Sequence, residues 1–97
     1  MVYVDDMRAS FGRMVMFHMI ADTREELYDM AKRIGVNFQW IQSAGIYREH
    51  FDICQSKKEL AISLGAIQIT QRELVEKIVA RKSQGGMEKY ENPIKSK

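Results

Sequence analysis

The sequence has little cysteine and no long hydrophobic segment. Cys54 is the only cysteine among 97 residues, so no disulfide can form within the chain, as in most proteins of a reducing cytosol. The most apolar stretch, residues 14–21, is short and contains His18, whereas a membrane-spanning helix needs about 20 apolar residues. The first residues reach Asp5 and Asp6 without the basic and apolar regions of an export signal. We therefore expect a cytoplasmic protein with no membrane-spanning segment.

The chain also lacks a strong excess of basic charge in its main part. Its net charge is +2, but residues 81–97 hold five Lys/Arg against two Asp/Glu, which leaves ten basic and eleven acidic groups in residues 1–80. Non-specific nucleic-acid binding depends on many basic side chains that neutralise phosphates. Strong binding of that kind is not expected, and the basic end is typical of a solubilising tail.

Motifs that identify common phosphate and metal sites are missing too. The glycines form neither GxGxxG nor GxxxxGK[ST], and the sequence contains no HExxH or CxxC. Any anion site would therefore have to use a helix N-terminus and individual basic side chains. Any metal site would have to be assembled from residues that lie far apart in the sequence.

Three segments carry the capping-box pattern, in which a Ser or Thr is followed three residues later by Glu. They are Thr23–Glu26, Ser56–Glu59 and Thr70–Glu73. Apolar residues at helical spacing follow each of them, which predicts helices over about 24–34, 57–64 and 71–83. Gly35 and Gly65 are the expected stops of the first two helices.

Short β-rich segments between these helices predict strands at about 2–4, 14–20, 36–41, 51–54 and 66–69. The predicted fold is therefore α/β, a single compact domain with a mixed sheet of about five short strands and three helices in the order β-β-α-β-β-α-β-α. Residues 1–83 form this domain, and residues 84–97 are predicted to be a flexible basic tail dispensable for folding. The expected core comprises Val4, Val15, Phe17, Leu27, Ala31, Ile34, Ile53, Leu60, Leu64, Ile67, Val75 and Ile78.

Four polar residues within or next to the predicted strands are candidate catalytic groups. His50 and Asp52 have the i, i+2 spacing that places both side chains on one face of a strand, as in a proton-transfer pair or half of a metal site. Asp5 ends the first strand, and His18 lies within the apolar stretch. Asp5, His50 and Asp52 are the metal candidates. The structural alternative is a packed, hydrogen-bonded His18 with the other three solvated.

Five further residues are candidates for ligand binding. Ser56 and Lys57 begin the second predicted helix. A lysine there opposes the helix dipole, which is mildly unfavourable unless an anion or an acidic neighbour compensates. Arg8 and Arg13 flank residues 9–12, read as a loop that could close over the same ligand. Trp40, the only tryptophan, could stack on a base or ring, and its structural alternative is core or edge packing.

The chain resembles domain-of-unknown-function family 4031 over roughly residues 2–70. The residues that carry the resemblance are Val2-Tyr3-Val4-Asp5-Asp6-Met7-Arg8, Gly12-Arg13-Met14, His18-Met19, Ala21-Asp22, Glu26-Leu27, Ile34-Gly35, Trp40-Ile41-Gln42, His50-Phe51-Asp52-Ile53, Ser56-Lys57 and Leu64-Gly65-Ala66. Phe51, where tyrosine is usual, and a longer loop at 43–49 depart from the pattern. The resemblance implies a small bacterial or bacteriophage protein without an assigned activity and, from that, a phage or prophage accessory role.

Two classes of function remain, and the sequence favours the first over the second. The first is a binding module for a small anionic ligand, phosphorylated or nucleotide-like, or for a host protein. The second is a compact metal-dependent phosphoester hydrolase that uses Asp5, His18, His50 and Asp52. Neither class of function identifies a particular cofactor or metal ion. Convergence of the four residues in one place would favour a site, and their dispersal would favour a plain scaffold.

Overall fold

A computed structural model describes residues 1–6, 9–11 and 14–83 of the chain. Arg8, Arg13 and the predicted tail at 84–97 lie outside these residues. The described part contains the following elements: β1 (Val2–Val4), β2 (Ala9–Phe11), β3 (Met14–Ala21), α1 (Arg24–Ile34), the 3₁₀ helix η1 (Phe38–Trp40), β4 (Ile41–Gln42), β5 (His50–Cys54), α2 (Gln55–Ser63), β6 (Ile67–Gln68) and α3 (Gln71–Ser83).

The strands form one mixed sheet in the order β4-β5-β3-β1-β6. β1 pairs parallel with β6, and the other pairs are antiparallel. This arrangement confirms the predicted α/β class, with five strands along the sheet and three α-helices. The segment read as a loop before β3 differs, because Ala9–Phe11 pairs antiparallel with Met14–Met16. Three residues are too few for an alternating pattern to reveal such a strand.

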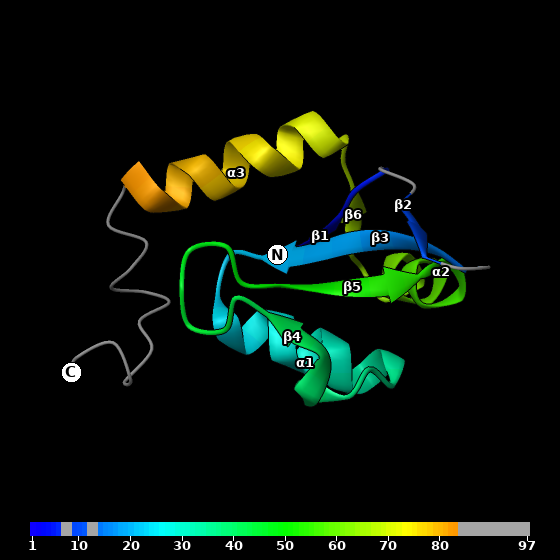
Figure 1. Ribbon diagram of the computed structural model, residues 1–97. Coiled ribbons are helices and arrows are strands. Elements are labelled where there is room, and N and C mark those ends of the chain that lie inside the picture. Colours follow the sequence, from blue (N-terminus) through cyan, green and yellow to red (C-terminus); the bar gives the residue numbers. More distant parts are fainter. Residues whose placement is uncertain (7–8, 12–13, 84–97) are drawn as a thin grey trace.

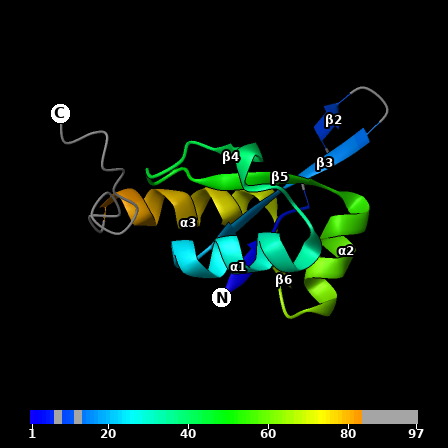
Figure 2. The same cartoon turned by 90° about the horizontal axis from the view of Figure 1, so that it is seen from below.

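Helices cover both faces of the sheet. α1 and α2 lie on one face and α3 lies on the other, as the two views show together (Figures 1 and 2). The main core lies under α1 and α2, where Val4, Met19 and Phe51 are fully buried. Because side chains alternate along a strand, the residues next to these three point toward the face that carries α3.

α1 forms as predicted. The hydroxyl of Thr23 accepts a hydrogen bond from the Glu26 amide, and Gly35 ends the helix with a left-handed φ of 79°. The predicted apolar stripe is buried in full, and it consists of Leu27, Met30, Ala31 and Ile34. The capping box of α3 also forms, since Thr70 and Glu73 each accept a hydrogen bond from the other's amide.

α2 differs from its prediction. It begins at Gln55 with Cys54 as its N-cap, so Ser56 lies inside the first turn and its capping box does not form. The chain passes from β5 into α2 without a loop, and this direct junction fixes the helix start. The face that packs on the sheet carries Lys58 and Ala61, whereas Leu60 is 40% exposed.

Two other predicted core residues are also exposed. Ile67 on β6 is 42% exposed and Val75 on α3 is 43% exposed, so the prediction was wrong for both. Of the apolar residues of α3, Leu74 is the one that is buried. No helix within the described ranges is long and apolar enough to cross a membrane.

Candidate metal centre

Strand register brings the four predicted catalytic residues together. His18 on β3 lies opposite Asp52 on β5, and the Asp5 amide donates to the His18 carbonyl just beyond the end of β1. His50 is two residues from Asp52 on the same strand, and its ring lies 5.2 Å from that of His18, centroid to centroid. Because Asp5, His18 and Asp52 each neighbour a core residue along the strand, all point away from α1.

Asp5 fixes the orientation of His18. Its side chain is fully buried, and its Oδ1 accepts the main-chain N–H of His18 at 2.9 Å. The other carboxylate oxygen lies 2.8 Å from Nδ1 of the His18 ring. This hydrogen bond raises the pKa of His18 above its ordinary value of 6.5, against the effect of burial, and the charges of Asp5 and Asp52 raise it further. An ionised carboxylate can only accept, so Nδ1 carries the proton and Nε2 of neutral His18 is a lone pair.

His50 is oriented in the same way by the main chain. Its Nδ1 lies 2.7 Å from the carbonyl oxygen of Arg48. A carbonyl oxygen can only accept, so Nδ1 of His50 carries a proton here as well. Nε2 of the neutral ring is therefore free to bind a metal ion, and it faces Asp52.

The carboxylate of Asp52 lies between the two Nε2 atoms. Its Oδ1 is 3.2 Å from Nε2 of His50 and 3.7 Å from Nε2 of His18. The short distance to His50 lacks the alignment of a hydrogen bond: among the described residues, Asp52 Oδ1 is a buried atom without a partner. Three electron-pair donors thus converge with no proton between them when both rings are neutral. Such an arrangement is stabilised by a bound cation or by a proton.

The geometry fits a small divalent transition metal. One ligand atom from each of His18, His50 and Asp52 lies within 4.8 Å of the others. Zinc bonds of about 2.0–2.2 Å place tetrahedral ligands roughly 3.3 Å apart, close to the separations around Asp52 Oδ1. Metal-bound histidines usually donate their second ring N–H to a carboxylate or carbonyl. Asp5 and the Arg48 carbonyl provide such acceptors. Asp5, a predicted candidate for a metal ligand, thus contacts Nδ1 of His18 and not the cluster of ligand atoms around Nε2.

The predicted ligand-binding residues that the structure describes, Ser56, Lys57 and Trp40, do not gather around this cluster. Nζ of Lys57 lies 3.1 Å from the position that a Cβ on Gly35 would occupy, at the C-terminal end of α1. Lys58 is also directed to that side of the sheet, because its Nζ lies 3.9 Å from the centroid of the Phe17 ring. Trp40 is 60% exposed on η1, next to a Phe38 ring that packs against Tyr28 of α1.

Ser56 has a local role at the start of α2. Its hydroxyl lies 3.3 Å from Sγ of Cys54, and this contact lowers the pKa of the thiol, together with main-chain amides of the first turn. Cys54 does not belong to the group of convergent ligand atoms found among the described residues.

One buried charged residue next to the cluster was missed by the sequence analysis. Glu49 is fully buried, and its carboxylate accepts from Arg24, from the hydroxyl of Tyr28 and from the Gly45 amide. Burial raises the pKa of Tyr28, which keeps its hydroxyl protonated as a donor. A lone glutamate between Arg48 and His50 in a loop has no sequence signal that distinguishes it from a solvated one.

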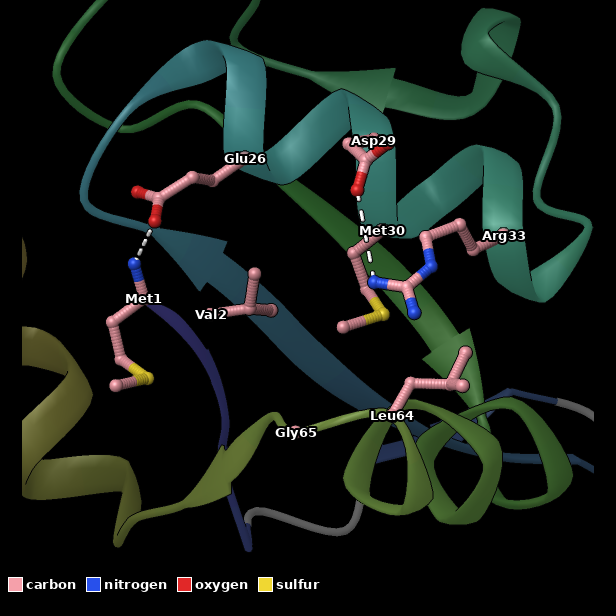
Figure 3. Close-up of a pocket in the computed structure, with 8 residues that line it drawn as sticks. All are labelled: Met1, Val2, Glu26, Asp29, Met30, Arg33, Leu64 and Gly65. Carbon is pink, nitrogen blue, oxygen red and sulfur yellow. Dashed lines mark hydrogen bonds and ion pairs between the residues drawn. The ribbon is translucent and has the colours of Figure 1, made fainter.

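A pocket of about 190 Å³ lies elsewhere, on the side of β1 that faces α1 and α2 (Figure 3). The close-up shows its charged groups directed at one another: the Met1 ammonium toward Glu26, and Arg33 toward Asp29. These pairs satisfy the charges without a ligand. The full lining is Met1, Val2, Glu26, Asp29, Met30, Arg33, Leu64 and Gly65.

The fold and the cluster thus define a small α/β domain with a candidate cation site on its sheet. The chain belongs to the DUF4031 family of proteins of unknown function, whose sequence profile matches residues 2–81. No curated protein and no solved structure matches the chain. The family relationship supplies no reaction.

The raised pKa of His18 predicts how the stability of the metal-free protein depends on pH. A group whose pKa is higher in the folded state stabilises the fold below its unfolded value, here about 6.5. That contribution is lost as the pH rises through the higher folded value. The melting temperature of chelator-treated protein should therefore fall from pH 6 toward pH 8 relative to His18→Gln. Parallel profiles of the two proteins would contradict the assignment.

Proposed function

We propose that the protein is a metal-dependent phosphoester hydrolase, with a divalent transition-metal ion held by His18, His50 and Asp52. The observation that carries the proposal is the buried, unpartnered Oδ1 of Asp52, which faces Nε2 of both histidines. Acceptors on the far side of each ring already hold the Nδ1 protons. Because the Nδ1 protons point away from the cluster, the Nε2 lone pairs of both neutral rings point toward Asp52. Inward-pointing lone pairs favour a metal ion over a simple hydrogen-bonded cluster.

The chemistry of the ligand set supports a catalytic use of the ion. Catalytic zinc sites keep three protein ligands and an open position, whereas structural sites are closed by four. A water molecule in the open position loses a proton near neutral pH and becomes a nucleophile. Among the described residues, three side chains converge. The side chains of His18, His50 and Asp52 are 28%, 21% and 41% exposed, so the cluster lies near the surface although Asp52 Oδ1 itself is buried.

Charge supports a phosphoester as substrate once the ion is bound. Asp5 and Asp52 give the metal-free cluster two negative charges when both histidines are neutral, and this charge repels phosphate. A divalent ion neutralises the pair and polarises an anionic oxygen directly. The ion would therefore do what the sequence analysis expected of Lys57, whose Nζ lies beside α1.

A metal-dependent binding module for a phosphorylated ligand is the second candidate. The observation in its favour is that all four polar side chains of the cluster are used, three as ligands and Asp5 as the support of His18. None of these groups is then left to protonate a leaving group. A phage or prophage accessory role fits either candidate.

Calorimetric titration with Zn²⁺ and Mn²⁺ tests the metal site. We expect the chelator-treated protein to bind Zn²⁺, and His50→Ala and Asp52→Ala to weaken binding by more than about 100-fold, because each removes a direct ligand. Asp29→Ala is the matched control, since Asp29 is an exposed carboxylate on α1. Loss of Zn²⁺ binding in the control as well, or no binding by the wild type, would contradict the proposal.

Turnover separates the two candidates. The zinc- and manganese-loaded proteins should hydrolyse bis-p-nitrophenyl phosphate or p-nitrophenyl phosphate, and His50→Ala should abolish the activity. If inorganic phosphate binds at the metal site but no phosphoester is hydrolysed, the binding module is favoured instead. The variants His50→Ala and Asp52→Ala, purified in parallel, control for trace phosphatase contamination.

A further inference from the structure

The segment that joins β4 to β5 is anchored to α1 through Glu49. Oε1 of Glu49 lies 2.9 Å from Nε of Arg24, and Oε2 accepts from the Tyr28 hydroxyl at 2.9 Å and from the Gly45 amide at 3.1 Å. Gly45 has a φ of 80°, a left-handed conformation that glycine adopts without strain. A buried carboxylate is tolerated where its oxygens are paired and hydrogen-bonded, as here.

The same segment is held from the opposite side by α3. The guanidinium of Arg81 donates to the carbonyl oxygens of Tyr47 at 3.0 Å and of Glu49 at 3.4 Å. It also donates to the carbonyl of Ala21 at the end of β3. The main chain on both sides of Arg48 is therefore attached to both helical layers.

The Arg48 carbonyl lies between these fixed points and is the acceptor for His50 Nδ1. Its direction determines whether the Nδ1 proton has an acceptor, and so which nitrogen of neutral His50 is protonated. A main-chain carbonyl cannot turn independently of its neighbours, because the peptide unit is planar. The orientation of the peptide between Arg48 and Glu49 is thus determined by Glu49, whose side chain is buried.

We propose that Glu49 is a positioning residue for the metal centre, which fixes the tautomer and orientation of His50 through the Arg48 carbonyl. The inference rests on the proposed metal site, but it makes a separate claim about the protein without metal. Glu49 does not contact the ligand atoms. It acts by holding the peptide that accepts the Nδ1 proton.

Glu49→Gln is the sharpest variant because it preserves size while removing one acceptor. An amide nitrogen at the Oε1 position would oppose the Nε–H of Arg24, and at the Oε2 position it would oppose the Tyr28 hydroxyl and the Gly45 amide. Neither orientation satisfies all donors, since the NH₂ group of glutamine can only donate. The segment then loses part of its anchor, and the Arg48 carbonyl loses its fixed direction.

Two measurements test the role of Glu49. Long-range ¹H–¹⁵N spectra of the chelator-treated protein, assigned with His18→Gln, should show His50 with its proton on Nδ1 in the wild type and a substantial Nε2–H population in Glu49→Gln. Zn²⁺ affinity should fall about 10–100-fold, as for other outer-sphere supports. Asp29→Asn is the matched control and should resemble the wild type in both measurements.

The outcomes distinguish the two proposals. Failure of the wild type to bind Zn²⁺ would overturn the metal site, while the tautomer spectra would still decide the role of Glu49. An unchanged His50 tautomer and unchanged Zn²⁺ affinity in a folded Glu49→Gln would overturn the inference alone. If that variant does not fold, Tyr28→Phe removes one hydrogen bond from the same oxygen. It should shift the tautomer in the same direction to a smaller extent, and no shift would likewise overturn the inference.

Discussion

Replacing Leu27 with alanine is expected to lower the free energy of unfolding by about 2–5 kcal/mol, the usual cost of removing a fully buried leucine side chain. Leu27 is completely buried in the core between α1 and the sheet. Leu60→Ala is the matched variant on α2, and it should cost only about 0.5 kcal/mol, as for most surface positions, because Leu60 is 40% exposed.

Urea denaturation of both variants measures the difference. The slope of the free energy against urea should stay that of the wild type, so that the change appears in the midpoint. Similar large losses for both variants would mean that α2 packs on the sheet with the face predicted from its leucines. The contrast between the two leucines is therefore a direct test of how α2 is rotated.

The helices that could be predicted from the sequence are those whose ends are set locally. In α1 the cap of Thr23, the apolar stripe and the stop at Gly35 all agree. In α2 the local capping box of Ser56 competes with a junction that β5 imposes, and the junction determines the start at Gln55. Lys58 then places its ammonium group over the Phe17 ring. The apolar pattern of the sequence predicts leucine, and not lysine, on the buried face of this helix.

The candidate site could be predicted in part because its side chains carry unusual chemistry for strand positions. Asp5, His18, His50 and Asp52 were all identified, but their convergence depends on the register of β1, β3 and β5, which no local pattern contains. The main-chain group that orients His50 could not be predicted from the sequence for a different reason. The Arg48 carbonyl that orients His50 is a group that every residue has.

Asp5→Asn is expected to impair the metal centre most severely among changes outside the three ligands. The asparagine oxygen can keep the hydrogen bond that Oδ1 accepts from the His18 amide. Its NH₂ group then takes the place of Oδ2, which lies 2.8 Å from Nδ1 of His18. Two donors cannot face each other, so Nδ1 becomes an acceptor and the proton moves to Nε2. A protonated Nε2 cannot bind a metal ion.

The expected loss of Zn²⁺ affinity is about 100-fold, at the upper end for outer-sphere changes. Any hydrolytic activity should fall further, since the same substitution lowers kcat about 10⁴-fold in Ser-His-Asp triads by selecting the wrong tautomer. The matched control is Asp22→Asn, at an exposed carboxylate that accepts a hydrogen bond from Tyr3. Its Zn²⁺ affinity and activity should equal those of the wild type.

The tautomer of His18 makes the result interpretable. Long-range ¹H–¹⁵N spectra should show the His18 proton on Nδ1 in the wild type and on Nε2 in Asp5→Asn, with melting temperatures confirming that both are folded. A changed tautomer with unchanged Zn²⁺ affinity would mean that His18 is not a ligand. The ion would then be held by His50 and Asp52 without the third ligand that a catalytic zinc site uses.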